Sequence, residues 1–222
     1  MKKYITEENN FLYLFLALVG LLLFSALTSL IHKPFIKISL DFFLIGVFLV
    51  SLLSTKFNDS WKRSVYLFSF LLLSLTLVQH ILFSSVIQYL ILLVLFLFFI
   101  GSFMQSFWQI INAKRLDLNM IIGSIVLYLL LGLIFTIIYL GLLGILPDSL
   151  DGVSGSSWRE NFTSVTYFSF VTLSTLGYGD IIPGNALSKF FAYSESIAGV
   201  FYMAIIVASI VSLRLKESKD VH

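Results

Sequence analysis

The segment TLGYG, residues 175–179, has the residue types and spacing that could do chemistry. Glycine enters the positive-φ region at little cost, and Gly177 and Gly179 supply this freedom at alternate positions. A chain that alternates between ordinary and mirror-image dihedrals can turn consecutive carbonyl groups towards one axis. These residues are therefore the candidate functional site, with main-chain oxygens as its principal binding groups.

Apolar stretches surround residues 175–179 and must position them. A membrane-spanning helix needs about 20 mainly apolar residues. Leu118–Leu146 is one such stretch, and a last span with its core at Ser196–Leu213 is expected to begin as a helix near Ala186. Between them, Asn161–Leu173 is apolar and aromatic but too short to cross. We expect this stretch to form a re-entrant helix, with Asn161 as its N-cap.

Four further spans are predicted in the first half of the chain. Phe11–Ile31 is an apolar run, and Ile38–Thr55 is interrupted only by Asp41. No Asp, Glu, Lys or Arg lies between Arg63 and Lys114, a stretch long enough for two spans with a polar turn near residues 79–88. The predicted fold is an all-α membrane protein with six transmembrane helices, divided into a four-helix domain (1–113) and a second domain (114–222) that contains TLGYG.

Composition excludes several classes of protein. Hydrophobic residues make up 59% of the chain and charged residues 12%, whereas soluble domains carry about 25% charged residues. The net charge of +2 and the lack of a basic stripe argue against a nucleic-acid partner. The chain has no cysteine, and no paired carboxylate, metal-ligand set or nucleophile–base arrangement is apparent. We therefore expect neither an enzyme nor a cofactor.

The region around residues 175–179, which are called the filter segment below, resembles the potassium channel family, so the second domain (114–222) is expected to be a pore domain. The selectivity filter of that family has the motif T-(V/I/L)-G-Y-G-(D/N), and residues 175–180 are TLGYGD. The flanking residues 167–169 and 181–183 also fit, and the resemblance extends from about Asn119 to Leu213. It implies a passive K⁺-selective channel, in which rings of backbone carbonyls replace the hydration shell of the ion. Since one chain supplies one filter strand, it also implies a homotetramer.

The same resemblance implies roles for individual residues. K⁺ is expected to bind at Thr175, Leu176, Gly177 and Tyr178, with the Thr175 hydroxyl as the innermost ligand. The side chains of Leu176 and Tyr178 are expected to point away from the ion and wedge the strand against the re-entrant helix.

Support for the filter is expected from outside it. In the family, the acid after the second glycine hydrogen-bonds to an aromatic residue on the pore helix, and Asp180 and Tyr167 occupy these positions. Some relatives place a glutamate where this chain has Val171, so the resemblance does not extend to an acid pair behind the filter.

The last predicted span contains one acid, Glu195. Ionisable residues within membrane helices are candidates for function. We expect Glu195 either to hydrogen-bond near Thr172 or Ser174 or to stay protonated, with a purely structural acid as the alternative. Gly199 is expected to be a hinge, with close helix packing as the alternative. A stripe with four-residue spacing is predicted to line the inner cavity: Gly199, Met203, Val207 and Val211.

Voltage sensing is not expected. A voltage sensor needs regularly spaced basic residues on its fourth span, and residues 86–108 contain none. Asp41 could pair with Lys37 one turn earlier, and His80 is placed in a solvated turn. Regulation is therefore expected from membrane lipids, from the filter itself or from a separate regulatory protein.

The basic residues predict that both termini are cytoplasmic in a multi-pass protein of the cell membrane. With that orientation ten basic residues lie inside and four outside. The inner ten are Lys2, Lys3, Lys56, Lys62, Arg63, Lys114, Arg115, Arg214, Lys216 and Lys219, and the outer four are Lys33, Lys37, Arg159 and Lys189.

Three other functions are considered. A weakly selective cation channel could carry the same filter sequence, and a membrane scaffold could keep the pore fold without conducting. Potassium transporter subunits resemble four fused pore modules with one filter glycine each, whereas this chain has a single complete TLGYG. That difference argues against the transporter.

Overall fold

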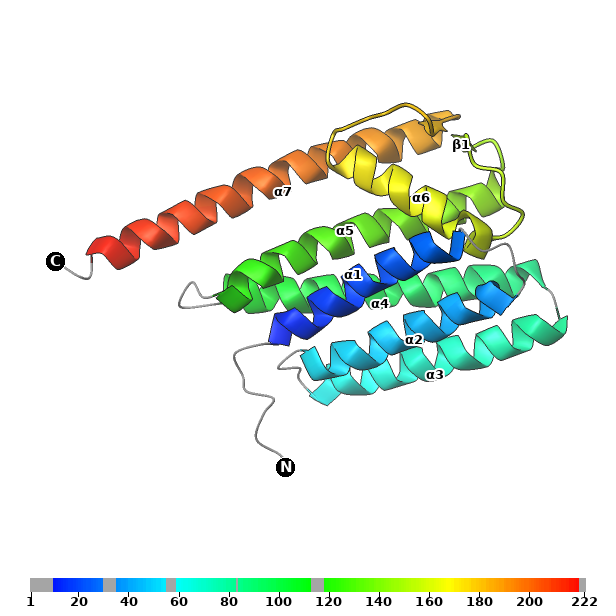
Figure 1. Cartoon of the computed structure of the whole chain (residues 1–222), viewed down its shortest axis with the longest axis horizontal. Helices are drawn as coiled ribbons and strands as arrows, with labels where there is room; N and C mark the ends of the chain where they lie inside the picture. The colour runs from blue at the N-terminus through cyan, green and yellow to red at the C-terminus, as the bar shows by residue number, and fades with distance from the viewer. Residues whose placement is uncertain (1–9, 30–34, 55–58, 83, 113–117, 220–222) are drawn as a thin grey trace.

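The computed structural model describes residues 10–29, 35–54, 59–82, 84–112 and 118–219, and in these ranges the chain is almost entirely helical (Figure 1). The helices are α1 (Asn10–Ser29), α2 (Phe35–Ser54), α3 (Asp59–Leu82), α4 (Ser85–Ile111), α5 (Leu118–Ile145), α6 (Trp158–Leu173) and α7 (Ala186–Lys219). Two short strands complete the described elements, β1 (Leu150–Asp151) and β2 (Ile182–Pro183).

Four of the helices contain stretches that are long and apolar enough to cross a membrane. These stretches are Phe11–Thr28, Trp61–Gln79, Ser85–Ile111 and Leu118–Ile145. α2 adds a shorter apolar segment, Leu40–Ser51. The chain is therefore an all-helical, multi-pass membrane protein, and the total of six spans stays a prediction.

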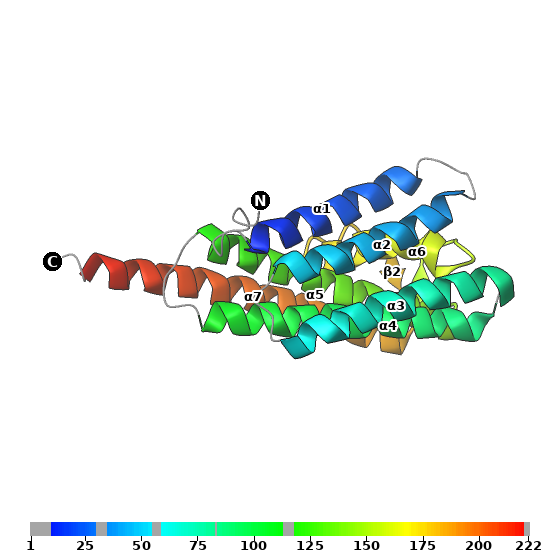
Figure 2. The same ribbon diagram turned by 90° about the horizontal axis from the view of Figure 1, so that it is seen from below.

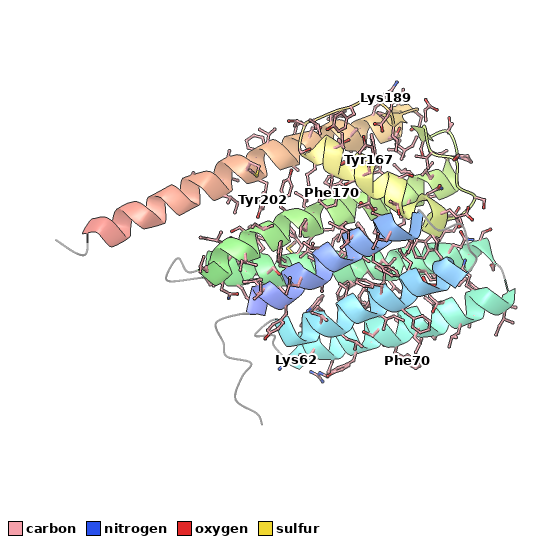
Figure 3. The ribbon with its side chains drawn as sticks, in the orientation of Figure 1. Lys62, Phe70, Tyr167, Phe170, Lys189 and Tyr202 are labelled. Atoms are coloured by element: carbon pink, nitrogen blue, oxygen red, sulfur yellow. The ribbon has the colours of Figure 1, made fainter. Side chains whose placement is uncertain are left out.

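The helices α1–α4 lie side by side and form what we call the four-helix unit (Figures 1 and 2). Successive helices pack against each other, and both α1 and α4 also pack along α5. α5 is apolar on all sides and is the most buried of the four long apolar stretches, as expected of a helix with neighbours all round. α3 is the least buried, with side chains such as Phe70 on its outer face (Figure 3).

The starts of α1 and α5 are joined by a buried polar contact. The backbone N–H of Phe11 donates to Asn119 Oδ1 at 3.0 Å. The first four N–H groups of a helix have no partner within the helix, and apolar surroundings offer no water as an acceptor. The Asn119 side chain accepts a hydrogen bond from one of these N–H groups of α1. This contact fixes the register of the four-helix unit against α5.

α6 and α7 lie on the other side of α5 (Figure 1). α7 packs against α6 near its own start and then runs away from the other helices towards the C-terminus (Figure 1). The loop before α6 and the segment after residue 180 are paired through β1 and β2, with Leu150 opposite Pro183 and Asp151 opposite Ile182. This pairing closes the polypeptide around the outer side of α6 and the filter segment.

Candidate functional site

α6 begins three residues earlier than the sequence suggested. Its N-cap is Ser157, whose side chain accepts a hydrogen bond from the Glu160 N–H at 3.5 Å. Asn161 lies inside the first turn and its side-chain amide donates to the Gly155 carbonyl at 3.0 Å, so the prediction that Asn161 caps the helix is wrong. The sequence does contain a signal for the observed start of α6, because Ser157-Trp-Arg-Glu160 has the Ser/Thr-x-x-Glu spacing that is typical of helix starts.

The filter segment follows α6 directly and has an alternating backbone. Thr175, Gly177 and Gly179 have φ angles of 59°, 60° and 80°, and they are the only described residues with positive φ apart from Gly152. The two glycines adopt this region at little cost, but a β-branched threonine does so rarely. Glycine positions could be predicted from the sequence, whereas the threonine conformation could not.

Backbone hydrogen bonds hold the start of the filter segment to the end of α6. The Thr175 N–H donates to the Thr172 carbonyl, and the Leu176 N–H donates to the Val171 carbonyl, both at 2.9 Å. These bonds use carbonyls that a helix end would leave without partners. The unusual conformation of Thr175 is thus stabilised from both sides.

Two aromatic rings join the filter segment to α6. The rings of Tyr178 and Tyr167 are stacked, with centroids 6.4 Å apart and planes 6° from parallel. The Asp180 carboxylate also lies near the Tyr167 hydroxyl and acts on it electrostatically. The structure therefore brings together Tyr167, Tyr178 and Asp180 behind the segment.

The filter segment is exposed in the single chain. Leu176 and Tyr178 are more than half exposed, and a side chain added at Gly177 or Gly179 would meet nothing within 4 Å. Among the described residues, no cluster of three or more His, Asp or Glu side chains is arranged to hold a metal ion.

Glu195 is fully buried and links α7 to both α5 and α6. Its carboxylate accepts a hydrogen bond from the Tyr139 hydroxyl at 2.8 Å, and the Ser169 hydroxyl lies 2.5 Å from its other oxygen. The expected partners were Thr172 or Ser174, so the contact with α6 lies about one turn earlier than predicted. The neighbouring Ser196 makes the contact with Thr172 instead, donating to its carbonyl at 3.1 Å.

Gly199 lies at a close contact between α7 and the end of α6. A Cβ atom at this position would be 2.0 Å from the Leu173 carbonyl oxygen. Close packing, the alternative given for this glycine, is therefore present in the structure, and its use as a hinge stays a prediction. In the predicted cavity stripe, Met203 is half exposed, and the side chains of Val207 and Val211 lie outside the described residues.

A buried ion pair that the sequence analysis missed holds the start of α6. Arg159 Nη2 lies 2.9 Å from Asp41 Oδ2 in α2, and Arg159 Nη1 donates to Gln79 Oε1 in α3 at 3.1 Å. Asp41 was expected to pair with Lys37, whose side chain lies outside the described residues. The side chain of His80 also lies outside them. No local pattern connects Asp41 with Arg159, because 118 positions separate them.

Comparison with known proteins agrees with this geometry. A family model described as ion channel matches residues 125–215, which span most of α5, all of α6, the filter segment and most of α7. The matched region is therefore similar to ion channels, and the part of the chain predicted as a pore domain contains the whole match.

Two potassium channels are similar to parts of the chain. "Two-pore potassium channel 4" of Arabidopsis thaliana is 34% identical over 94 residues, which cover 40% of this chain and 32% of that protein. "Potassium channel, subfamily K, member 16" of Mus musculus is 40% identical over 58 residues, 26% of this chain and 18% of that protein. The chain thus spans less than a third of the length of these relatives, and its resemblance to the potassium channel family is confirmed.

Proposed function

We propose that the chain is one subunit of a homotetrameric channel that conducts K⁺ selectively and passively across the cell membrane. The observation that carries this proposal is the alternation of positive φ at Thr175, Gly177 and Gly179, in a TLGYGD sequence at the end of a short helix. The similarity of the surrounding region to potassium channels supports it. In the proposed channel, six helices span the membrane, α6 is the re-entrant pore helix and both termini are cytoplasmic.

K⁺ must shed water to pass through a narrow pore. Four filter segments around one axis would supply rings of carbonyl oxygens from Thr175, Leu176, Gly177 and Tyr178, with the Thr175 hydroxyl below them. No side-chain charge is needed, because dipoles at short range replace the hydration shell. The C-terminal end of α6 carries the negative end of the helix dipole. Four such ends would favour a cation in a cavity lined by Gly199, Met203, Val207 and Val211.

The proposed channel is not intrinsically voltage-sensing. α4 contains no basic residue, and moving one elementary charge through 100 mV is worth only about 2.3 kcal/mol, so several are needed for steep voltage dependence. Membrane lipids, the filter or a separate regulatory protein would then control conduction. K⁺ is the permeant ion, and the proposed function includes no cofactor and no nucleic-acid partner.

Reversal potentials of the purified protein in planar bilayers test the proposal. With K⁺ on one side and Na⁺ on the other, the current should reverse near the K⁺ equilibrium potential. A reversal near zero would instead support a weakly selective cation channel. The absence of any K⁺ flux that barium blocks would support a non-conducting scaffold.

Gly177→Ala tests the assignment of the filter segment. A Cβ atom disfavours the left-handed region by about 1–2 kcal/mol per residue, and Gly177 has φ 60°. We expect the variant to lose either K⁺ selectivity or tetramer assembly. Gly141→Ala in α5 is the matched control, because nothing lies within 4 Å of the added Cβ and the residue is helical. A Gly177→Ala channel with unchanged selectivity would show that the filter lies elsewhere.

A further inference from the structure

The outer end of α6 is held by three side chains that come from three different helices. Arg159 Nε lies 3.0 Å from each oxygen of Asp41, Arg159 Nη2 lies 2.9 Å from Asp41 Oδ2, and Arg159 Nη1 lies 3.1 Å from Gln79 Oε1. The guanidinium therefore reaches α2 and α3 at once. We call this set of three residues the outer bridge.

The outer bridge is buried. The side chains of Arg159 and Asp41 are 8% and 5% exposed, and Gln79 is also buried. Hydrogen bonds to charged groups are stronger than neutral ones, and removal of one partner leaves an uncompensated charge away from water. The Arg159 guanidinium also lies over the Trp158 ring, with Cζ 4.5 Å from its centroid.

The position of Arg159 is unfavourable for α6 taken alone. The N-terminus of a helix carries the positive end of its dipole, and a cation there is destabilising. Arg159 is the second residue of α6. The local helix sequence therefore gives no reason for a cation here, whereas the carboxylate of Asp41 on α2 does. This points to a role in joining α6 to the four-helix unit.

A second contact lies one turn along α6 on the same face. The Thr163 hydroxyl donates to the Ser25 carbonyl of α1 at 2.9 Å. Another turn further, Tyr167 stacks on Tyr178 of the filter segment. From Arg159 to Tyr167 is eight residues of continuous helix, about 12 Å at 1.5 Å per residue. A shift of α2 or α3 can therefore be transmitted to Tyr178 through one rigid element.

We infer that the outer bridge couples the four-helix unit to the filter segment, and that Arg159 is a positioning residue that stabilises the conducting conformation of the filter. This inference rests on the proposed K⁺ channel function. It gives the first four helices a task that requires no gating charge. Movement or distortion of the unit, by the bilayer or by a bound partner, would act on conduction through α2, α3 and α6.

The test compares Asp41→Asn, Arg159→Gln and the double variant of the full chain in planar bilayers. The measured quantity is the rate at which K⁺ current declines during sustained conduction, at low and at high external K⁺. We expect each single variant to accelerate the decline by about tenfold, a typical coupling between two sites. External K⁺ should slow the decline, since ions bound to the conducting filter stabilise it by mass action.

The double variant separates coupling from fold stability. Each single variant breaks the ion pair between Arg159 and Asp41, so thermal dissociation of the tetramer should occur at a lower temperature. The double variant should recover much of that stability, because it removes both charges of the pair. Its current should nevertheless decline as fast as in the single variants. A decline that recovers together with the thermal stability would overturn the inference.

Tyr89→Phe is the matched control. The Tyr89 hydroxyl of α4 donates to the Gly144 carbonyl of α5 at 2.5 Å, so this variant also removes a bond between the four-helix unit and the pore domain, but one that does not touch α6. We expect its decline rate to be unchanged. An acceleration equal to that of Arg159→Gln would show that any loosening of the unit suffices, and would overturn the inference.

Gln79→Ala keeps the test decisive if the charged variants do not assemble. It removes only the Nη1 contact and leaves the ion pair, so we expect an acceleration of about threefold. An assembled Gln79→Ala channel whose current declines at the same rate as that of the unaltered channel would then refute the role of the outer bridge.

Absence of K⁺ flux from the unaltered protein would refute the proposed function together with this inference. Normal flux with insensitive variants would refute the inference alone.

Discussion

Two buried polar contacts of α6 differ in their chemistry and in the helices that they join to α6. At the outer end, Arg159 meets the carboxylate of Asp41, so two opposite charges are buried together. In the inner half, the carboxylate of Glu195 meets only hydroxyl groups, those of Tyr139 and Ser169. The outer bridge connects α6 to the four-helix unit. The contacts of Glu195 with Tyr139 and Ser169, called the inner anchor below, connect α6 to α5 and α7.

This difference predicts different consequences of damage. Loss of one partner in the outer bridge breaks a buried ion pair, whereas loss of the acid in the inner anchor takes an acceptor away from two buried hydroxyl groups, of which Ser169 can still donate to the Gly132 carbonyl. The inner anchor also lies beside the close contact between Gly199 and Leu173, so it belongs to a tightly packed region with little room for adjustment. Variants that disturb this packing should therefore mainly change assembly, whereas variants of the outer bridge should also accelerate the decline of the current.

The largest effect is expected for Gly199→Ala. The added Cβ would lie 2.0 Å from the Leu173 carbonyl oxygen, which is backbone and cannot rotate away. Overpacking of this kind costs about 3 kcal/mol per chain, so the tetramer should dissociate at a clearly lower temperature. Size-exclusion chromatography after stepwise heating measures this.

Gly46→Ala is the control for that variant, because nothing lies within 4 Å of a Cβ at Gly46 and alanine favours a helix by about 1 kcal/mol. Its dissociation temperature should be unchanged or higher. If Gly199→Ala keeps full thermal stability but changes channel opening, Gly199 acts as a hinge and the close contact is not what requires a glycine.

A smaller effect is expected for Glu195→Ala. The hydroxyl groups of Tyr139 and Ser169 would lose their common acceptor, which costs about 2 kcal/mol. Thermal dissociation of the tetramer again gives the measurement. Ser169 also lies 2.7 Å from the Gly132 carbonyl, so part of the loss is recovered there.

Glu195→Gln keeps an acceptor oxygen in the same place and is the conservative partner of that variant. We expect it to alter open probability or filter stability in single-channel recordings and to leave K⁺ over Na⁺ selectivity unchanged. Unchanged gating together with unchanged tetramer stability would show that Glu195 acts only as a structural hydrogen-bond acceptor and that its acid group has no role in gating.

The smallest effect is expected for Ser157→Ala, at the outer end. Loss of an N-cap side chain costs about 1 kcal/mol, and the Glu160 N–H would lose its acceptor. Hydrogen exchange at the first turn of α6 should become faster while selectivity stays the same. Asn161→Ala tests the competing assignment: if it frays the helix more than Ser157→Ala does, Asn161 contributes more to the start of α6 than its contact with Gly155 suggests.

Much of the helical framework could be predicted because apolar runs fix helices in a membrane. The last helix was expected to begin near Ala186 and does so, and the turn between α3 and α4 falls where Gln79 to Gln88 predicted a polar break. Such features depend on neighbouring residues alone. The end of a span is set by the local loss of hydrophobicity, which the sequence displays directly.

The contacts of the site depended on distant residues and could not be predicted in the same way. Glu195 bonds to Tyr139, 56 positions away, and Arg159 pairs with Asp41, 118 positions away. The sequence suggested Lys37, one turn away on the same helix, as the partner of Asp41. Local spacing carries no information on which helices pack together, so it could not indicate Arg159. The positive φ of Thr175 was equally hidden, since threonine does not favour it.

The short connection between α4 and α5 has a consequence for biogenesis. α4 ends at Ile111 and α5 begins at Leu118, so the intervening six residues can extend at most about 22 Å. Each four-helix unit must therefore remain beside the α5 of its own chain. In the proposed tetramer, a newly inserted chain can complete most of its packing before it meets another copy. Subunit stoichiometry, and any mixing with related chains, would then be decided by the exposed surfaces of the filter segment, α6 and α7.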